Sequence, residues 1–201
     1  PELQGVMGGY FAEAQGFEKE VYQSISEHYL PSGNDSRVPK NLYSITLSLS
    51  DKIDSLVGFF GLGLIPTGSK DPYALRRYTI GLVRLIIENK IRIKLRSIIN
   101  YSLTLYKEQG FEFDITKVLK ELNYFILERL KNYSKEKNIR SDIIEGSISA
   151  NDIDELYNGF KKAEVLNKNI SKELGQNVVG IYKRSSNILK SEISKNKIEL
   201  S

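Results

Sequence analysis

The 201-residue sequence is long enough for one large domain or two small ones. Hydrophobic residues make up 40% and charged residues 27%, which is typical of globular proteins and excludes a disordered chain. The net charge of +4 is a modest indication of a polyanionic partner, although a lysine-rich surface without such a partner gives the same value.

Hydropathy, the opening residues and the lack of cysteine exclude several protein classes. The most apolar run, residues 56–65, is interrupted by glycines and is far shorter than the ~20 residues that cross a bilayer. The opening PELQGVMGG has no basic start and no long apolar stretch, so we expect neither a signal peptide nor a membrane partner, and a chain that begins with Pro1 is expected to be a piece of a longer polypeptide. The absence of cysteine excludes disulfides and thiolate chemistry and favours a cytoplasmic location.

Apolar residues recur at spacings of three and four, which predicts a chain that is nearly all helix, and strict alternation is hard to find. Two short helices are expected over 5–15 and 18–29. Pro31 ends the second helix because proline cannot extend it, and residues 31–39 then form a loop.

A longer helix is expected over 42–60, where seven apolar residues fall on one face. Clustered glycines then predict an irregular connector up to Asp71. Asp71-Pro72 indicates the next helix start, because aspartate accepts the unpaired N–H groups and proline at the first position has none to lose. That helix is expected over 73–89.

The helical period continues over 90–109, so these residues predict helix again, with an open question of whether Asn89 interrupts it. Asp114 indicates the start of a helix over 115–133. The polar stretch 131–138 is either a frayed helix end or a hinge.

Two more helices complete the prediction. Asn151 and Asp154 indicate a cap for a helix that runs to about Leu166, and a last helix is expected over 170–188. No repeat of 20 to 50 residues is found. The prediction is therefore an all-α fold, an irregular helical bundle, with domains over 1–110 and 111–201.

Three residues suggest a metal centre. Asp51 and Asp54 lie three apart on one predicted helix and could share a cation with His28, the only histidine. This arrangement faintly resembles the HD-type phosphohydrolases, but the chain has no His-Asp doublet, and one histidine cannot supply a multi-ligand cluster. The simpler interpretation is a helix-end histidine and a solvated acidic face.

The most uneven charge distribution lies between residues 70 and 96. Only Asp71 and Glu88 oppose the cations there, which are Lys70, Arg76, Arg77, Arg84, Lys90, Arg92, Lys94 and Arg96. Such a strip can neutralise the phosphates of a nucleic acid, or it can be solvated or face a partner subunit. A second basic run over 161–197 has no function that its composition can assign.

A family resemblance rests on five motifs in order along the chain: PELQGVMG from Pro1, EHYLP from Glu27, DKIDSLVGFF from Asp51, PTGSKDPYALRR from Pro66 and KRSSNIL from Lys183. Together they resemble the beta subunit of bacterial heterotetrameric glycyl-tRNA synthetase. The similarity is strong over the first half, while residues 96–180 resemble the family mainly in helical character and length.

The resemblance implies an enzyme of two alpha and two beta chains in which the alpha subunit uses ATP and magnesium to activate glycine and the beta subunit positions the tRNA for glycine. It also implies a degenerate HD-like N-terminal half followed by a helical body, with His28, Asp51 and Asp54 as remnants of a metal-site fold. We therefore expect no catalytic residue, metal or cofactor in this chain.

Three hypotheses follow. The first is a noncatalytic tRNA-binding and scaffolding segment of a glycine-tRNA ligase, with Lys70, Arg76, Arg77, Arg84, Lys90 and Arg92 as candidate RNA contacts. The second is a metal-dependent phosphohydrolase that uses His28, Asp51 and Asp54. The third is a structural module whose basic strip contacts another subunit or domain.

Overall fold

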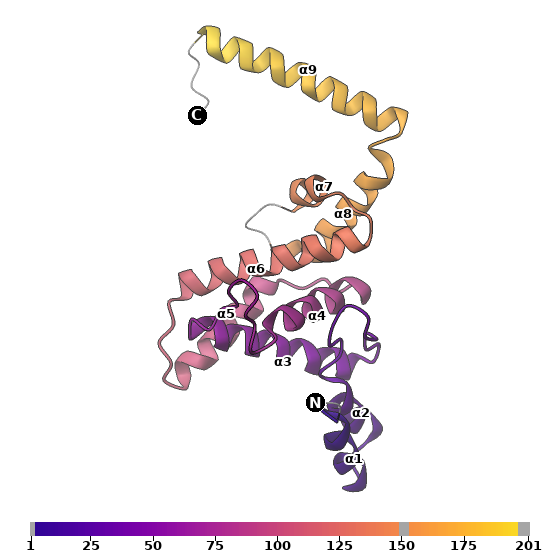
Figure 1. Ribbon diagram of the computed structural model, residues 1–201, viewed down its shortest axis with the longest axis vertical. Helices are drawn as coiled ribbons and strands as arrows, with labels where there is room; N and C mark the ends of the chain where they lie inside the picture. Colours follow the sequence, from indigo (N-terminus) through magenta and orange to yellow (C-terminus); the bar gives the residue numbers. More distant parts are fainter. Residues whose placement is uncertain (1–2, 149–152, 197–201) are drawn as a thin grey trace.

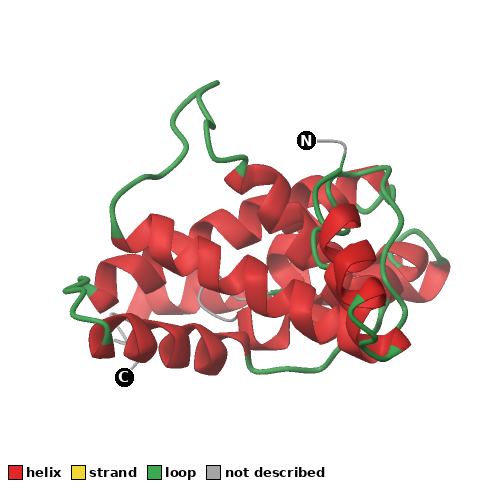
Figure 2. Cartoon of the chain, turned by 90° about the horizontal axis from the view of Figure 1, so that it is seen from below, coloured by secondary structure: helices red, strands yellow, loops and turns green. Residues whose placement is uncertain are grey.

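The computed structural model describes residues 3–148 and 153–196. Within them the chain folds into α-helices joined by loops, and the β-type pairing found there is an isolated bridge between Thr67 and Lys70 (Figures 1 and 2). The all-α prediction is confirmed. No helix among these residues is long and apolar enough to cross a bilayer.

The body of the molecule consists of α3 to α6, with α7 and α8 packed near the end of α6 (Figure 1). The α1–α2 hairpin projects from this body, and α9 extends away from it at the opposite end. The elements in chain order are α1 (Val6–Ala14), α2 (Lys19–Glu27), α3 (Leu42–Gly61), α4 (Leu75–Glu88), α5 (Leu95–Glu108), α6 (Ile115–Glu136), α7 (Ser141–Ser147), the 3-10 helix η1 (Ile153–Glu155), α8 (Leu156–Asn169) and α9 (Glu173–Asn196).

The core is centred on α4, which packs against α3, α6 and α8. Every residue of α4 from Thr79 to Ile87 is buried, so the middle of this helix has no solvent-facing side. The main apolar cluster extends from Ile53 to Ala163 and crosses residue 110. A division into domains at that residue stays a prediction.

The sequence predicts α1, α2, α3 and α6 closely, because each combines an apolar stripe with a clear start or stop. The Asn41 side chain accepts a hydrogen bond from the Tyr43 N–H at 2.9 Å and caps α3. Asp114 accepts one from the Lys117 N–H at 3.0 Å and caps α6, as expected. Residues 131–136 continue α6, which ends at Glu136, so a frayed end over this stretch is not found, and a hinge stays a prediction.

The start of α4 differs from the prediction. The helix begins at Leu75, after Ala74 in the left-handed region with φ 56°, so Pro72 is not its first residue. Asp71 nevertheless caps it from outside, because its two carboxylate oxygens accept from the Leu75 N–H at 2.8 Å and the Arg76 N–H at 3.0 Å. The predicted cap at Asp71 is confirmed, whereas the turn over residues 72–74 that separates it from α4 was not predicted.

The predicted helix over 90–109 is wrong at its start. Asn89 ends α4, Lys90 adopts φ 57°, and α5 begins only at Leu95. In between, Ile91 and Ile93 are half-buried against the core, while Arg92 and Lys94 are exposed. This short alternation was not predicted, and it anchors a non-helical segment to the core by every second side chain.

The C-terminal elements also differ in detail. The helix α7, only seven residues long, is too short for its period to stand out and was not predicted. Helix α8 runs to Asn169 and α9 runs over 173–196, so the last helix begins and ends later than expected. The predicted cap at Asn151 lies outside the described residues.

Candidate nucleic-acid interface

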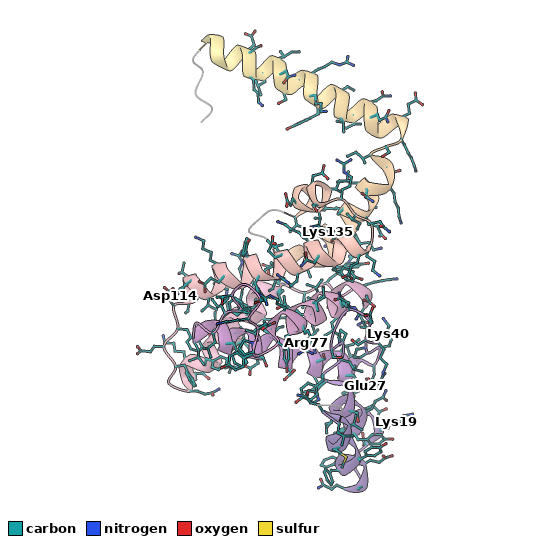
Figure 3. All side chains as sticks on the ribbon, viewed as in Figure 1. Lys19, Glu27, Lys40, Arg77, Asp114 and Lys135 are labelled. Atoms are coloured by element: carbon teal, nitrogen blue, oxygen red, sulfur yellow. The ribbon has the colours of Figure 1, made fainter. Side chains whose placement is uncertain are left out.

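The six predicted RNA contacts do not form one strip. Three of them lie near the start of α4, Arg84 lies in its buried middle, and Lys90 and Arg92 follow its end (Figure 3, where Arg77 and Lys40 are labelled). A helix of 14 residues is about 20 Å long. The exposed cations therefore belong to two groups, separated by a helix that is covered on all sides.

In the group at the start of α4, Lys70 and Arg77 are exposed. Arg76 is half-buried, and its guanidinium donates a hydrogen bond to the Gly68 carbonyl at 2.6 Å. The connector is held further by Tyr73, whose ring stacks on Phe59 with centroids 4.4 Å apart. Arg76 thus fixes the connector, which leaves Lys70 and Arg77 as the two cations directed to solvent.

Arg84 is the clear correction among the predicted contacts. Its side chain is buried, its Nε donates to Glu88 at 2.8 Å, and its Nη1 donates to the Gly33 carbonyl at 2.5 Å. A guanidinium in this position ties the loop before α3 to α4 and cannot reach a phosphate without leaving both partners. We therefore remove Arg84 from the candidate RNA contacts.

The second group is the 90–96 segment, which we define by its four exposed cations Lys90, Arg92, Lys94 and Arg96. They occupy every second position, and the intervening Ile91, Ile93 and Leu95 pack against the core. Residues two apart in a chain lie at most about 7 Å from each other. The result is a short row of cations on a backbone that the core holds in place.

Neighbouring side chains extend this row. Lys40 donates from Nζ to Asn89 Oδ1 at 3.0 Å and to the Glu88 carbonyl at 3.3 Å, which brings another exposed lysine to the end of α4. The Arg92 guanidinium lies 5.9 Å from the ring centre of Tyr157 on α8. Lys40 was not among the predicted contacts, because its hydrogen bond to Asn89 joins residues almost 50 positions apart.

The predicted metal residues are only partly brought together. His28 ends α2, and its Nδ1 donates to the Ile25 carbonyl at 2.6 Å, while Asp51 lies close enough on α3 to interact with it electrostatically. Asp54 instead receives hydrogen bonds from Ser102 at 3.4 Å and Tyr106 at 3.3 Å on α5. No group of three or more histidine, cysteine or acidic side chains suited to a metal ion occurs among residues 3–148 and 153–196.

A lysine, rather than a metal ligand, dominates this region. Lys52 is 2% exposed, and its Nζ donates to the carbonyls of His28, Tyr29 and Leu30 at 3.2 to 3.3 Å and to Ser48 Oγ at 2.9 Å. Burial lowers the pKa of Lys52 to about 8, against the opposing effect of Asp51. Burial also raises the pKa of Asp51, one of whose oxygens has no hydrogen-bond partner. The hydrogen bonds of the Lys52 ammonium hold the end of α2 against α3.

A cavity of about 570 Å³ between α6, α7 and the start of α5 is a further feature that sequence reasoning missed. Its floor is apolar and includes Leu119, Leu127 and Ile144. At its rim, Lys131 is paired with Glu128 and Glu145, each at 3.0 Å. These ion pairs stabilise the junction of α6 and α7, and Arg96 and Lys120 also line the cavity.

A family model described as "Glycyl-tRNA synthetase beta subunit" matches residues 1–149. The chain is 38% identical over 201 residues to a protein of Cereibacter sphaeroides (strain ATCC 17029 / ATH 2.4.9) named "Glycine--tRNA ligase beta subunit", covering 100% of this chain and 29% of that protein.

Two further relatives carry the same name. A protein of Rickettsia canadensis (strain McKiel) is 40% identical over 189 residues, covering 94% of this chain and 27% of the relative. One of Phenylobacterium zucineum (strain HLK1) is 37% identical over 195 residues, covering 97% and 26%. The chain thus spans less than a third of the length of these relatives. Since the family model matches well over half of its residues, the chain belongs to the glycyl-tRNA synthetase beta subunit family.

Proposed function

We propose that this chain is a tRNA-binding and scaffolding part of the beta subunit of a cytoplasmic glycine-tRNA ligase. In this proposal the alpha subunit uses ATP and magnesium to activate glycine, and the two alpha and two beta chains assemble into the working enzyme. The observation that carries the RNA-binding role is the 90–96 segment, a row of exposed cations held by the half-buried Ile91 and Ile93 and the buried Leu95. Cations held in this way can neutralise consecutive phosphates with little ordering of the protein backbone.

The region around His28, Asp51 and Asp54 has a structural role in this proposal. It is the remnant of an HD-like metal-site fold, in which the Lys52 ammonium now occupies the space between α2 and α3. A hydrolytic metal centre needs several ligands around one point, whereas Asp54 is directed to α5. We therefore do not propose the phosphohydrolase.

The test is fluorescence anisotropy of labelled tRNA for glycine over a salt series. One variant combines Lys90→Glu, Arg92→Glu and Lys94→Glu, and a second combines Lys70→Glu and Arg77→Glu. Lys107→Glu with Lys117→Glu serves as the control, because both lysines are exposed and lie outside the two groups. Each lost phosphate contact should reduce the slope of log affinity against log salt by roughly one.

We expect the 90–96 variant to bind at least tenfold more weakly at low salt and to have a slope smaller by about two to three. The Lys70 and Arg77 variant should show a smaller loss, because it removes only two cations. An equal loss in the control, or no tRNA binding by the wild type at low salt, would contradict the proposal. In the latter case the basic groups would instead be assigned to subunit contacts.

A further inference from the structure

A pocket lies between the 90–96 segment on one side and η1 and α8 on the other. Its volume of about 270 Å³ is slightly below the range of about 300–1,000 Å³ that is usual for small-molecule sites. Ile91, Ile93 and Leu156 contribute to its apolar lining, and Tyr157 adds an aromatic ring. We call it the Tyr157 pocket, and its size suits one planar ring system rather than a larger ligand.

The two walls of the Tyr157 pocket are fixed to each other and to the core. Asp154 of η1 accepts a hydrogen bond from the Arg96 backbone N–H at 2.6 Å, which ties the end of the 90–96 segment to the opposite wall. Arg92 reaches across from the same segment, with its guanidinium 5.9 Å from the ring centre of Tyr157. Tyr157 is itself only 9% exposed and belongs to the main core. The pocket is therefore formed before a ligand binds, which lowers the ordering cost of binding.

The opening of the Tyr157 pocket is cationic. Arg92 and Lys94, which are exposed, line it together with Asp154 and Asn158, and the row of cations continues on either side. A complementary ligand carries negative charge outside the pocket and an apolar planar group inside it. A nucleotide has both, because its phosphate is joined through a ribose to an aromatic base. Bases stack readily on aromatic rings and on guanidinium planes.

The pocket distinguishes two forms of RNA that the cations alone do not. In a base-paired helix the bases are stacked and hydrogen-bonded inside, so the row of cations meets only phosphates and sugars. A base can enter a pocket beside the row only where it is unpaired and turned out of the stack. An unpaired strand therefore makes a favourable contact with this surface that a duplex does not make.

We propose that the Tyr157 pocket takes the base of an unpaired nucleotide while Arg92 and Lys94 bind the adjoining phosphates, so that the 90–96 segment selects single-stranded RNA over base-paired RNA. This selectivity rests on the proposed function, which assigns RNA to the segment, and adds the class of RNA that it binds. Bases of every kind have an aromatic face, so the selection is for an unpaired strand and not for one base.

The test is fluorescence anisotropy of the 201-residue chain with three labelled probes of about 12 nucleotides. The first is an unpaired oligoribonucleotide of mixed sequence, the second is the same strand annealed to its complement, and the third is the same strand with abasic riboses throughout. The abasic strand keeps every phosphate and loses the bases. The duplex carries twice the phosphates, so cations that act alone would favour it.

Two variants fill the Tyr157 pocket without changing the charge. Ile93→Trp enlarges a half-buried side chain that lines it from the 90–96 segment, and Asn158→Phe enlarges one that lines it from α8. The matched control is Asn132→Phe, at an exposed position of α6 that does not line the pocket. Circular dichroism verifies that each variant is folded, and a variant on each wall keeps the test decisive if one of them does not fold.

We expect the wild type to bind the unpaired strand at least tenfold more tightly than the duplex or the abasic strand. Each filling variant should bind the unpaired strand only as weakly as the abasic strand, while the control keeps the wild-type preference. Equal affinity of the wild type for the three probes, or filling variants that keep the preference, overturns the proposal.

The tRNA titration separates the failure of this proposal from the failure of the proposed function. Salt-sensitive binding of tRNA without a preference for the unpaired strand refutes the role of the pocket and leaves the proposed function intact. A chain that binds neither tRNA nor any of the three probes refutes both.

Discussion

The α1–α2 hairpin and the 90–96 segment expose opposite kinds of surface for opposite structural reasons. In the hairpin, glycines on the inner side let two helices approach closely, and the large aromatic side chains remain outside. In the 90–96 segment the apolar side chains turn inward and the cations remain outside. The α1 helix leaves its aromatic side chains in solvent because its small residues face α2, whereas the basic row is held in place by apolar side chains that pack on the core.

The two regions are also attached differently. The 90–96 segment is anchored by Ile91 and Ile93, which pack against the main core. The hairpin is joined to the body by polar contacts at its base, namely the Lys52 ammonium on the last carbonyls of α2 and the ion pair of Arg37 with Glu27 at 2.9 Å. Polar attachment should make the hairpin the more sensitive of the two regions to pH.

The largest predicted change in the free energy of unfolding distinguishes the buried Arg84 from the exposed Arg92. Arg84→Met should lower the free energy of unfolding by about 3 kcal/mol, because it leaves Glu88 without its paired cation and the Gly33 carbonyl without the Arg84 donor. The matched variant Arg92→Met should change stability by less than about 0.5 kcal/mol and weaken tRNA binding instead. Urea unfolding and anisotropy of both variants test this, and similar stability losses in the two would refute the distinction.

The second prediction concerns the pH dependence of stability that arises from Lys52 at the base of the hairpin. Because the pKa of Lys52 in the folded protein is lowered to about 8, the unfolded chain holds more protons between about pH 8 and its ordinary value near 10.5. Stability therefore rises with pH in this window, by about 2 kcal/mol between pH 8 and pH 10. Unfolding of the wild type and of Lys52→Met across this range measures the difference, and parallel curves would show that Lys52 does not titrate there.

The smallest effect tests the glycine packing of the hairpin. Gly9→Ala should destabilise the hairpin by roughly 1 kcal/mol, since the clash with Ser26 outweighs the gain in helix propensity. Gly146→Ala on α7 is the control, because its added methyl meets open space and should stabilise slightly. Hydrogen exchange of the α1 and α7 amides reports both changes. Stabilisation at both positions would mean that α1 is not held closely against α2.

Much of the helical fold could be predicted from the sequence, because long apolar stripes and caps such as Asp114 are local signals. The break between α4 and α5 could not, since Ile91, Leu95 and Ile98 fit a helical period, whereas Ile91 and Ile93 fit a short alternation. The core decides between the two patterns, because both Ile91 and Ile93 pack against it from the same side of the segment. The seven-residue helix α7 was missed for lack of length.

The candidate site was predicted only as a stretch of sequence. Basic composition between residues 70 and 96 was evident, but its division into two groups depends on α4 being surrounded by α3, α6 and α8. Arg84 and Arg77 have the same side chain. Arg84 is buried and paired because the loop that carries Gly33 packs against it, whereas Arg77 is exposed. Lys40 enters the site through a contact across almost 50 residues.

By itself, then, the sequence determined the helical class, the family motifs and the excess of positive charge, because these depend on residue type and local spacing. The tertiary structure alone decided which cations face solvent and which side of α1 is exposed. It also decided that Lys52 is buried, with its ammonium hydrogen-bonded to backbone carbonyls instead of water. The physical reason is that burial is a property of how distant segments pack. A charge or an aromatic ring takes its role from the neighbours that this packing provides.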